Sequence, residues 1–139
     1  MEPGFFIRNY TETDFPEMIT LWEDLGLGGA HRGDDNHVIV RTLQMGGRLL
    51  LRVEQVSGKI IGTSWLTVDG RRTYIHHFGI HRQFQEQGLA KVLLNASLNV
   101  AKTFGMQIKL EVHKDNAKAI SLYVKSGFVS LGDYQVYII

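Results

Sequence analysis

The stretch from Tyr74 to Phe104 constrains the fold more than any other part of the sequence. It begins as an alternating strand up to Ile80, turns through residues 82–87, and continues as a long helix with apolar residues at helical spacing. Gly105 stands where a helix-ending glycine is expected. Small residues at the junction let phosphates approach the free N–H groups that begin the helix. The pattern predicts a strand, an anion-binding turn and a helix, although an ordinary connection explains most short glycine motifs.

Length and composition place the chain among globular single domains. Its 139 residues suit one domain, 1–139, and its formal charge of +1 gives no reason to expect nucleic-acid binding. Cysteine is absent, which excludes disulfides, thiolate metal sites and a cysteine nucleophile, and we expect no metal. The first ten residues lack the pattern of a signal peptide, and no apolar run approaches the ~20 residues of a membrane span. We therefore expect a cytoplasmic protein.

The remaining periodicities predict an α/β fold with the order β-α-α-β-β-β-α-β-α-β-β, a mixed central sheet with helices on both faces. The expected strands cover residues 5–8, 48–56, 59–68, 73–80, 107–113, 128–131 and 134–139. The expected helices begin at Thr11 or Thr13, at Asp34 or Asp35, near Gly88, and at Asp115 or Asn116. Glycines 26, 28 and 29 end the first helix, and residues 37–40 fit a strand as well as a helix.

The strand 107–113 follows a helix, so it should lie parallel to the strand 74–80 in a right-handed crossover. Ligands of such sheets bind beyond the carboxyl ends of the strands, where the topology switches. We therefore expect the ligand cleft where these two strands part.

Three local signatures, in this order of elements, resemble the GNAT superfamily of N-acetyltransferases. Gln85, Gly88 and Ala90 are similar to the pyrophosphate signature Gln/Arg-x-x-Gly-x-Gly/Ala. The segment from Asn116 to Tyr123, followed by Gly127-Phe128, resembles Asn-x-x-Ala-x-x-Leu-Tyr-x-x-x-Gly-Phe. Phe78-Gly79-Ile80 stands where the family pairs a strand with pantetheine. The resemblance covers nearly the whole chain, which is similar to the single-domain bacterial type and to ribosomal-protein N-terminal acetyltransferases.

The resemblance implies acetyl-CoA as acetyl donor, bound by the residues of these signatures. The implied contacts are Phe78, Gly79, Ile80, Gln85, Glu86, Gln87, Gly88, Leu89, Ala90, Lys91 and Asn116. Glu86 departs from the family, which often has glycine or a basic residue there, and a carboxylate repels a diphosphate. Lys91, Arg82 and His81 offset this charge or are solvated surface residues; Asn116 also fits a simple helix cap.

The resemblance also implies the roles in catalysis. Tyr123 matches the tyrosine that protonates the departing sulfur, a role that suits a phenol with a pKa near ~10. The backbone N–H of Phe78 is the expected oxyanion donor, freed by a bulge that Gly79 would permit. The absence of cysteine favours direct attack of an amine on the thioester.

The general base has two equal candidates. Glu111 has the spacing to Asn116 found in acetyltransferases of ribosomal N-termini, and His76 has the position of a histidine in arylalkylamine acetyltransferases. An unperturbed histidine pKa of ~6.5 suits a base at neutral pH, whereas Glu111 would need a pKa raised by burial. His77, His113 and a mechanism without a dedicated base remain as minor alternatives.

These inferences predict an N-acetyltransferase acting on a small-molecule or peptide amine, with neither nucleic acid nor membrane as partner. The acceptor should enter between residues 25–35 and the last hairpin, where Glu23, Asp24, Asp34, Asp35 and Asp69 would attract a cation. The main alternative is a non-catalytic module that binds acyl-CoA. A homodimer is possible, and exchange of the last strand between two chains stays open.

Overall fold

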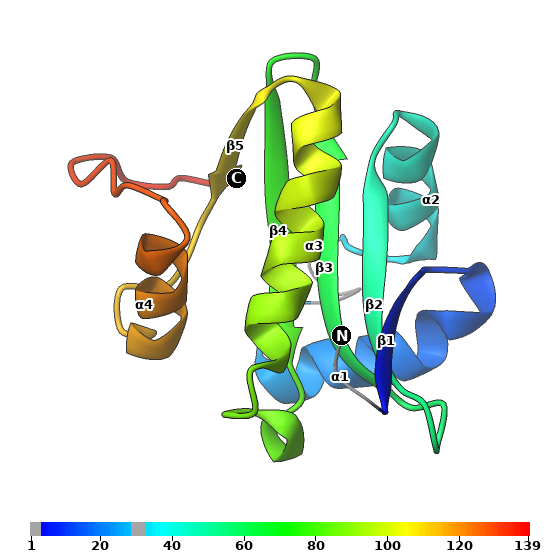
Figure 1. The fold of residues 1–139 in the computed structure, drawn as a ribbon. Helices are drawn as coiled ribbons and strands as arrows, with labels where there is room; N and C mark the ends of the chain where they lie inside the picture. Colours follow the sequence, from blue (N-terminus) through cyan, green and yellow to red (C-terminus); the bar gives the residue numbers. More distant parts are fainter. Residues whose placement is uncertain (1–3, 29–32) are drawn as a thin grey trace.

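A computed structural model describes residues 4–28 and 33–139 of the chain. It forms a five-stranded mixed sheet with helices on both faces, as the sequence predicts (Figure 1). The elements are β1 Phe5–Asn9, the 3-10 helix η1 Glu12–Asp14, α1 Phe15–Leu25, α2 Asn36–Gln44, β2 Arg48–Glu54, β3 Ile60–Val68, β4 Arg72–Ile80, the 3-10 helix η3 Arg82–Phe84, α3 Leu89–Phe104, β5 Gln107–Leu110 and α4 Ala117–Lys125.

The strands lie in the order β1-β2-β3-β4-β5. β2, β3 and β4 form an antiparallel meander, β1 pairs antiparallel with β2, and β5 pairs parallel to β4 after the crossover through α3. The predicted end of α3 is confirmed, because Gly105 adopts the left-handed conformation with φ 71°. These elements bring the carboxyl end of β4 close to the beginning of α3, where the sequence predicts the anion-binding turn.

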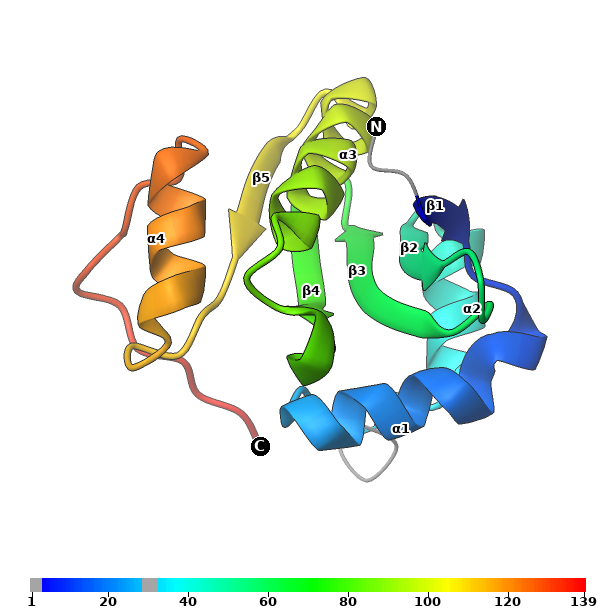
Figure 2. The ribbon, with the colours of Figure 1, turned by 60° about the horizontal axis from the view of Figure 1, so that its bottom comes forward.

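Each face of the sheet has its own apolar core. One core joins α1 and α2 to the sheet around Trp22, Ile39 and Trp65, and the other joins α3 and α4 to the opposite face around Leu93 and Tyr123. Figure 2 shows α3 on one side of the sheet and α1 on the other. Side chains of β4 therefore reach one of two separate environments, according to the face on which they lie.

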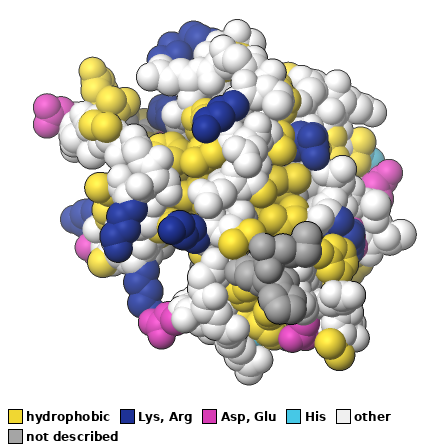
Figure 3. Space-filling model, in the orientation of Figure 1, with side chains coloured by type: hydrophobic (Ala, Val, Ile, Leu, Met, Phe, Trp, Pro, Cys, Tyr) yellow, Lys and Arg dark blue, Asp and Glu magenta, His cyan; other side chains and the backbone are white. Residues whose placement is uncertain are grey.

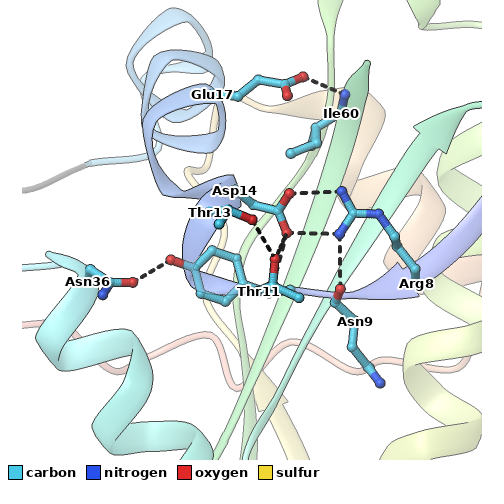
Figure 4. Close-up of polar contacts among 9 residues, drawn as sticks. Arg8, Asn9, Thr11, Thr13, Asp14, Glu17, Asn36 and Ile60 are labelled. Carbon is cyan, nitrogen blue, oxygen red and sulfur yellow. Dashed lines mark hydrogen bonds and ion pairs between the residues drawn. The ribbon is translucent and has the colours of Figure 1, made fainter. Parts of the chain in front are cut away.

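A polar network fixes the beginning of the first helix (Figure 4). Arg8 of β1 donates two hydrogen bonds of 2.8 Å to the carboxylate of Asp14, which also accepts from the backbone N–H of Thr11. Glu17 accepts a 2.7 Å hydrogen bond from the backbone N–H of Ile60 at the start of β3. These contacts confirm Thr11 as the entry to the helical region and hold α1 against the sheet.

The ambiguous segment before β2 is helical. The carboxylate of Asp35 accepts a hydrogen bond of 3.0 Å from the backbone N–H of Val38, as an N-cap does. Residues 36–44 form α2, whose Ile39 is completely buried, so the alternative of a strand over residues 37–40 is wrong. Of the glycines predicted to end α1, Gly26 does so with φ 68°, and Gly29 lies outside the described residues.

The predictions for the last part of the sheet need correction. β5 ends at Leu110 and not at His113, and residues 128–131 and 134–139 form no strands. Apart from Phe128, which packs against the core, the apolar side chains of this final segment stay exposed, including Val129 at 84% and Tyr137 at 87%. Alternation of apolar residues predicted strands here, but a strand also needs a partner edge, and within the described residues this segment pairs with no strand of the sheet.

Candidate active site

The site is organised by a bulge in β4. His76 pairs with Trp65 and Gly79 pairs with Thr63, so two residues of β4, His77 and Phe78, lie opposite one residue of β3. His77 takes the left-handed conformation with φ 44° that accompanies this irregularity. The bulge was expected from Gly79, but the residue with the unusual conformation is a histidine.

The bulge decides which face each side chain reaches. His76 and His77 both border the pocket beneath α2, although neighbours in a regular strand point to opposite faces. Phe78 lies on the other face, where its ring packs against Tyr123 with 5.9 Å between the centroids. Three consecutive residues of β4 therefore present side chains to both faces of the sheet.

A buried threonine holds this bulge in place. The hydroxyl of Thr63 donates a 2.6 Å hydrogen bond to the carbonyl oxygen of His77 and accepts one of 2.9 Å from the indole N–H of Trp22. Thr63 has no exposed surface, so water does not replace either contact. Nothing in the sequence pattern distinguished Thr63, because its role depends on α1 crossing β3 at this residue.

β4 and β5 part next to the bulge. Their parallel pairing covers Arg72–Ile75 and Gln107–Leu110, and the bulge begins two residues beyond its end. Beyond that point α4 stands apart from the sheet (Figures 1 and 2), and the surface is hollowed between α4 and the body of the protein (Figure 3). This is the predicted cleft, flanked by the strand, the start of α3 and the start of α4.

A pocket of about 230 Å³ opens on the α2 face of the bulge. Its walls come from the beginning and middle of α2, from β3 and from β4. The lining residues are Asp34, Val38, Thr42, Trp65, Thr67, His76 and His77. The pocket combines aromatic and aliphatic walls with one carboxylate and two imidazoles, so a few polar groups converge on a mainly apolar surface.

His76 is suited to accept a proton. Its Nε2 lies 2.7 Å from the hydroxyl of Thr67, and its ring stacks on Tyr74. Burial lowers the pKa of His76 from 6.5, an effect that the charge of His77 adds to and those of Asp34 and Glu111 oppose. His76 is therefore neutral at pH 7, with a lone pair available.

Glu111, the other candidate base, is exposed and follows directly after β5. Its charge acts on the pKa of His76, so the fold brings both candidates to one region. His113 is also exposed, at 72% of its side chain, and pairs with Asp115. Neither of these two residues lines the pocket.

His77 makes a polar contact with the loop before α2. Its Nε2 lies 2.8 Å from a carboxylate oxygen of Asp34, and both side chains are largely buried. The ring sits against Trp22, 4.5 Å between centroids, and near Trp65 at 5.5 Å. This contact fixes Asp34 at the edge of the pocket, whereas the sequence identified it only as one acid among several.

Tyr123 lies across the cleft on α4. It is 7% exposed, and burial raises its pKa to about 12, so the phenol stays protonated throughout the physiological range. Its ring contacts Phe128 as well as Phe78. The tyrosine belongs to the core, as packing alone would explain, and also faces the strand where a thioester is expected.

The turn before α3 has the features of an anion site. Gln85 donates a 2.8 Å hydrogen bond to the carbonyl oxygen of Ile80 and thus anchors the turn to the end of β4. Gly88, the N-cap, has φ 80°, no side chain to cap the helix, and open space where a Cβ would lie. The first N–H groups of α3 are therefore left for a ligand such as a diphosphate.

The charged residues around this turn have defined partners. Glu86 pairs with Lys118 of α4 at 2.6 Å, and Arg82 donates to the carbonyl oxygen of Asp24 at 2.9 Å. His81 accepts a hydrogen bond from the backbone of the next turn, and Lys91 is exposed. The sequence-based list of cations that offset Glu86 missed Lys118, although it stands inside the second signature.

Asn116 caps α4, its side chain accepting a 3.3 Å hydrogen bond from the backbone N–H of Ala119. This confirms the capping role, and contact with a cofactor stays a prediction. Within residues 4–28 and 33–139 no group of three or more histidine, aspartate or glutamate side chains is placed to hold a metal ion. No helix in the same ranges has the length and apolar character to cross a membrane.

Comparison with known proteins identifies the family of the chain. A model of the acetyltransferase (GNAT) family matches residues 7–128. The chain belongs to this family. It is accordingly an acyltransferase that uses acetyl-CoA as acetyl donor, and the turn at Gly88 fits the diphosphate of that molecule.

Solved structures share the fold at low sequence identity. A GNAT-family acetyltransferase from Staphylococcus aureus Mu50 has a TM-score of 0.81 at 18% identity, with 94% of this chain and 88% of that chain covered. Glucosamine-6-phosphate N-acetyltransferase from Arabidopsis thaliana has a TM-score of 0.79 at 18% identity, with 96% of this chain and 97% of that chain covered. A GNAT-family acetyltransferase from Elizabethkingia anophelis with acetyl-CoA bound has a TM-score of 0.67 at 23% identity, with 92% of this chain and 78% of that chain covered.

Proposed function

We propose that the protein transfers an acetyl group from acetyl-CoA to a compact primary amine by direct attack. The observation that carries this proposal is the bulge of β4, which places His76 in the α2-face pocket and Phe78 on the Tyr123 face. Donor and acceptor then approach the bulge from opposite sides of the sheet. Such an arrangement brings the reacting atoms together without a covalent enzyme intermediate.

His76 serves as the general base in this proposal. Its lowered pKa keeps the imidazole neutral, and the hydrogen bond to Thr67 fixes the ring within the pocket wall. It takes the proton that the amine nitrogen loses as the new C–N bond forms. Glu111 is the second candidate, and its exposure outside the pocket makes it the weaker one.

Two groups act on the donor side. The backbone N–H of Phe78, at the bulge, donates a hydrogen bond to the acetyl oxygen as negative charge develops there. Tyr123 gives its phenolic proton to the sulfur as the C–S bond breaks, and burial keeps that proton in place until then. The products are an N-acetylated amine and the free thiol of coenzyme A.

The pocket limits the acceptor. A volume of about 230 Å³ is below the range of sites for drug-sized ligands, so it holds a small amine or the first residue of a peptide. Asp34 attracts the ammonium form, which gives up one proton to solvent before the neutral amine attacks, and the face of Trp65 offers a further contact to a cation.

A thiol-release assay with a panel of small amines and short peptides tests the proposal. The wild-type protein should turn over compact amines, with kcat/KM rising as the pH increases through the lowered pKa of His76 and then levelling. His76→Gln should lose about a hundredfold in kcat/KM together with that acid limb. His113→Gln is the matched control at an exposed histidine. An unchanged pH profile in His76→Gln would remove His76 from the mechanism.

A further inference from the structure

The ion pair between Glu86 and Lys118 spans the mouth of the cofactor cleft. Glu86 lies in the turn before α3 with φ 65°, and Lys118 is the second residue of α4. Their charged atoms are 2.6 Å apart, although 32 positions separate the two residues in the chain. The pair thus links the two elements that flank the hollow visible in Figure 3.

The surroundings of this pair favour an anion. Two helices, α3 and α4, begin on either side of it, and the N-terminal end of each carries partial positive charge. At the beginning of α4, the side chain of Asn116 accepts a hydrogen bond from the backbone N–H of Ala119. At the beginning of α3, Gly88 has no side chain to cap the helix, so the first backbone N–H groups of α3 stay available to an anion. In the protein without cofactor, the anion nearest to Lys118 is the carboxylate of Glu86.

The pair is easily separated. Its side chains are 74% and 72% exposed for Lys118 and Glu86, and exposed ion pairs contribute little to stability. The hydrogen bond and the charge of Lys118 lower the pKa of Glu86, so the carboxylate is ionised at pH 7. A diphosphate arriving at the turn would repel this carboxylate and attract the same ammonium group.

We propose that Lys118 exchanges partners when the cofactor binds, leaving Glu86 for a phosphate of coenzyme A. Glu86 then acts as an internal competitor that lowers affinity for the cofactor and for the released product alike. The inference rests on the use of acetyl-CoA in the proposed function. It adds a binding residue outside the turn at Gly88 and gives the unusual glutamate a role.

The alternative is that Lys118 only neutralises Glu86, and two single variants with their double variant separate the two cases. Isothermal titration with coenzyme A should show Glu86→Gln binding about two- to fivefold more tightly than wild type. Lys118→Met should bind about tenfold more weakly, and the same loss should appear when Lys118→Met is added to Glu86→Gln. Binding by the double variant equal to that of Glu86→Gln would overturn the exchange.

Lys125→Met provides the matched control, because it removes the same charge from the exposed far end of α4. The affinity of Lys125→Met for coenzyme A should equal that of wild type. A tenfold loss in this variant would mean that any positive charge on α4 has the same effect, and would refute the proposal. Circular dichroism on each variant verifies that the fold is kept. If the wild-type protein bound no coenzyme A, the proposed function would be wrong. If wild type bound coenzyme A and Lys118→Met bound it equally well, only the proposed exchange of partners would be wrong.

Discussion

Replacing Thr63 by valine should destabilise the protein and disturb the bulge of β4 at once. Valine keeps the shape of the side chain but removes a hydroxyl that serves the carbonyl of His77 and the indole of Trp22. Both partners then lose this hydrogen bond, Trp22 in a fully buried place and the carbonyl of His77 in a part-buried one. At about 1–2 kcal/mol for each, the expected loss in free energy of unfolding is about 2–4 kcal/mol.

This loss converts into a measurable shift in thermal unfolding. With an unfolding entropy of about 2.1 cal/mol/K per residue, a chain of 139 residues should lose about 7–14 °C in Tm. Thr63→Ser is the control, because it keeps the hydroxyl and gives up one methyl group, at about 1 kcal/mol. Differential scanning calorimetry compares the three proteins.

Activity supplies a second measure of the same substitution. Because the carbonyl of His77 loses its donor in Thr63→Val, His76 and Phe78 should shift relative to one another. Turnover by the folded fraction should fall in the valine variant and be kept in the serine variant. A valine variant as stable and active as the serine variant would refute the idea that this hydroxyl holds the bulge.

Two further predictions concern Asp14 and Tyr123. The pKa of Asp14 is lowered chiefly by its hydrogen bonds from Arg8, so this contact stabilises the fold above pH ~4 and is lost as the pH falls through the lowered pKa. In urea unfolding at pH 7, Asp14→Asn should lower the free energy of unfolding by about 1–3 kcal/mol, and the loss of stability toward acid pH should become smaller than in wild type. Asp115→Asn removes a carboxylate from an exposed pair and should change the free energy of unfolding little. Tyr123→Phe should slow thiol release more than tenfold while calorimetry shows unchanged coenzyme A binding; equal turnover would exclude the phenol as proton donor.

Local sequence signals predicted most of the architecture correctly. Helix caps such as Asp35, the glycine at position 105 and the tight turns of the meander act over a few residues, so they can be identified without knowledge of the fold. The final segment was different. Residues 134–139 have the composition of a strand, but their pairing depends on an edge that β5, only four residues long, does not provide.

The residues of the candidate site also fall into those that the sequence predicts and those that only the fold reveals. Motif spacing placed the anion-binding turn at Gly88, the tyrosine at position 123 and a histidine at position 76, because these features lie within short, contiguous signatures. Only the folded chain brings Lys118 to Glu86, Asp34 to His77 and Thr63 beneath the bulge, since each contact joins residues at least 14 positions apart. The difference has one physical cause: a short segment specifies its own backbone conformation, whereas a distant partner is chosen by how helices and strands pack.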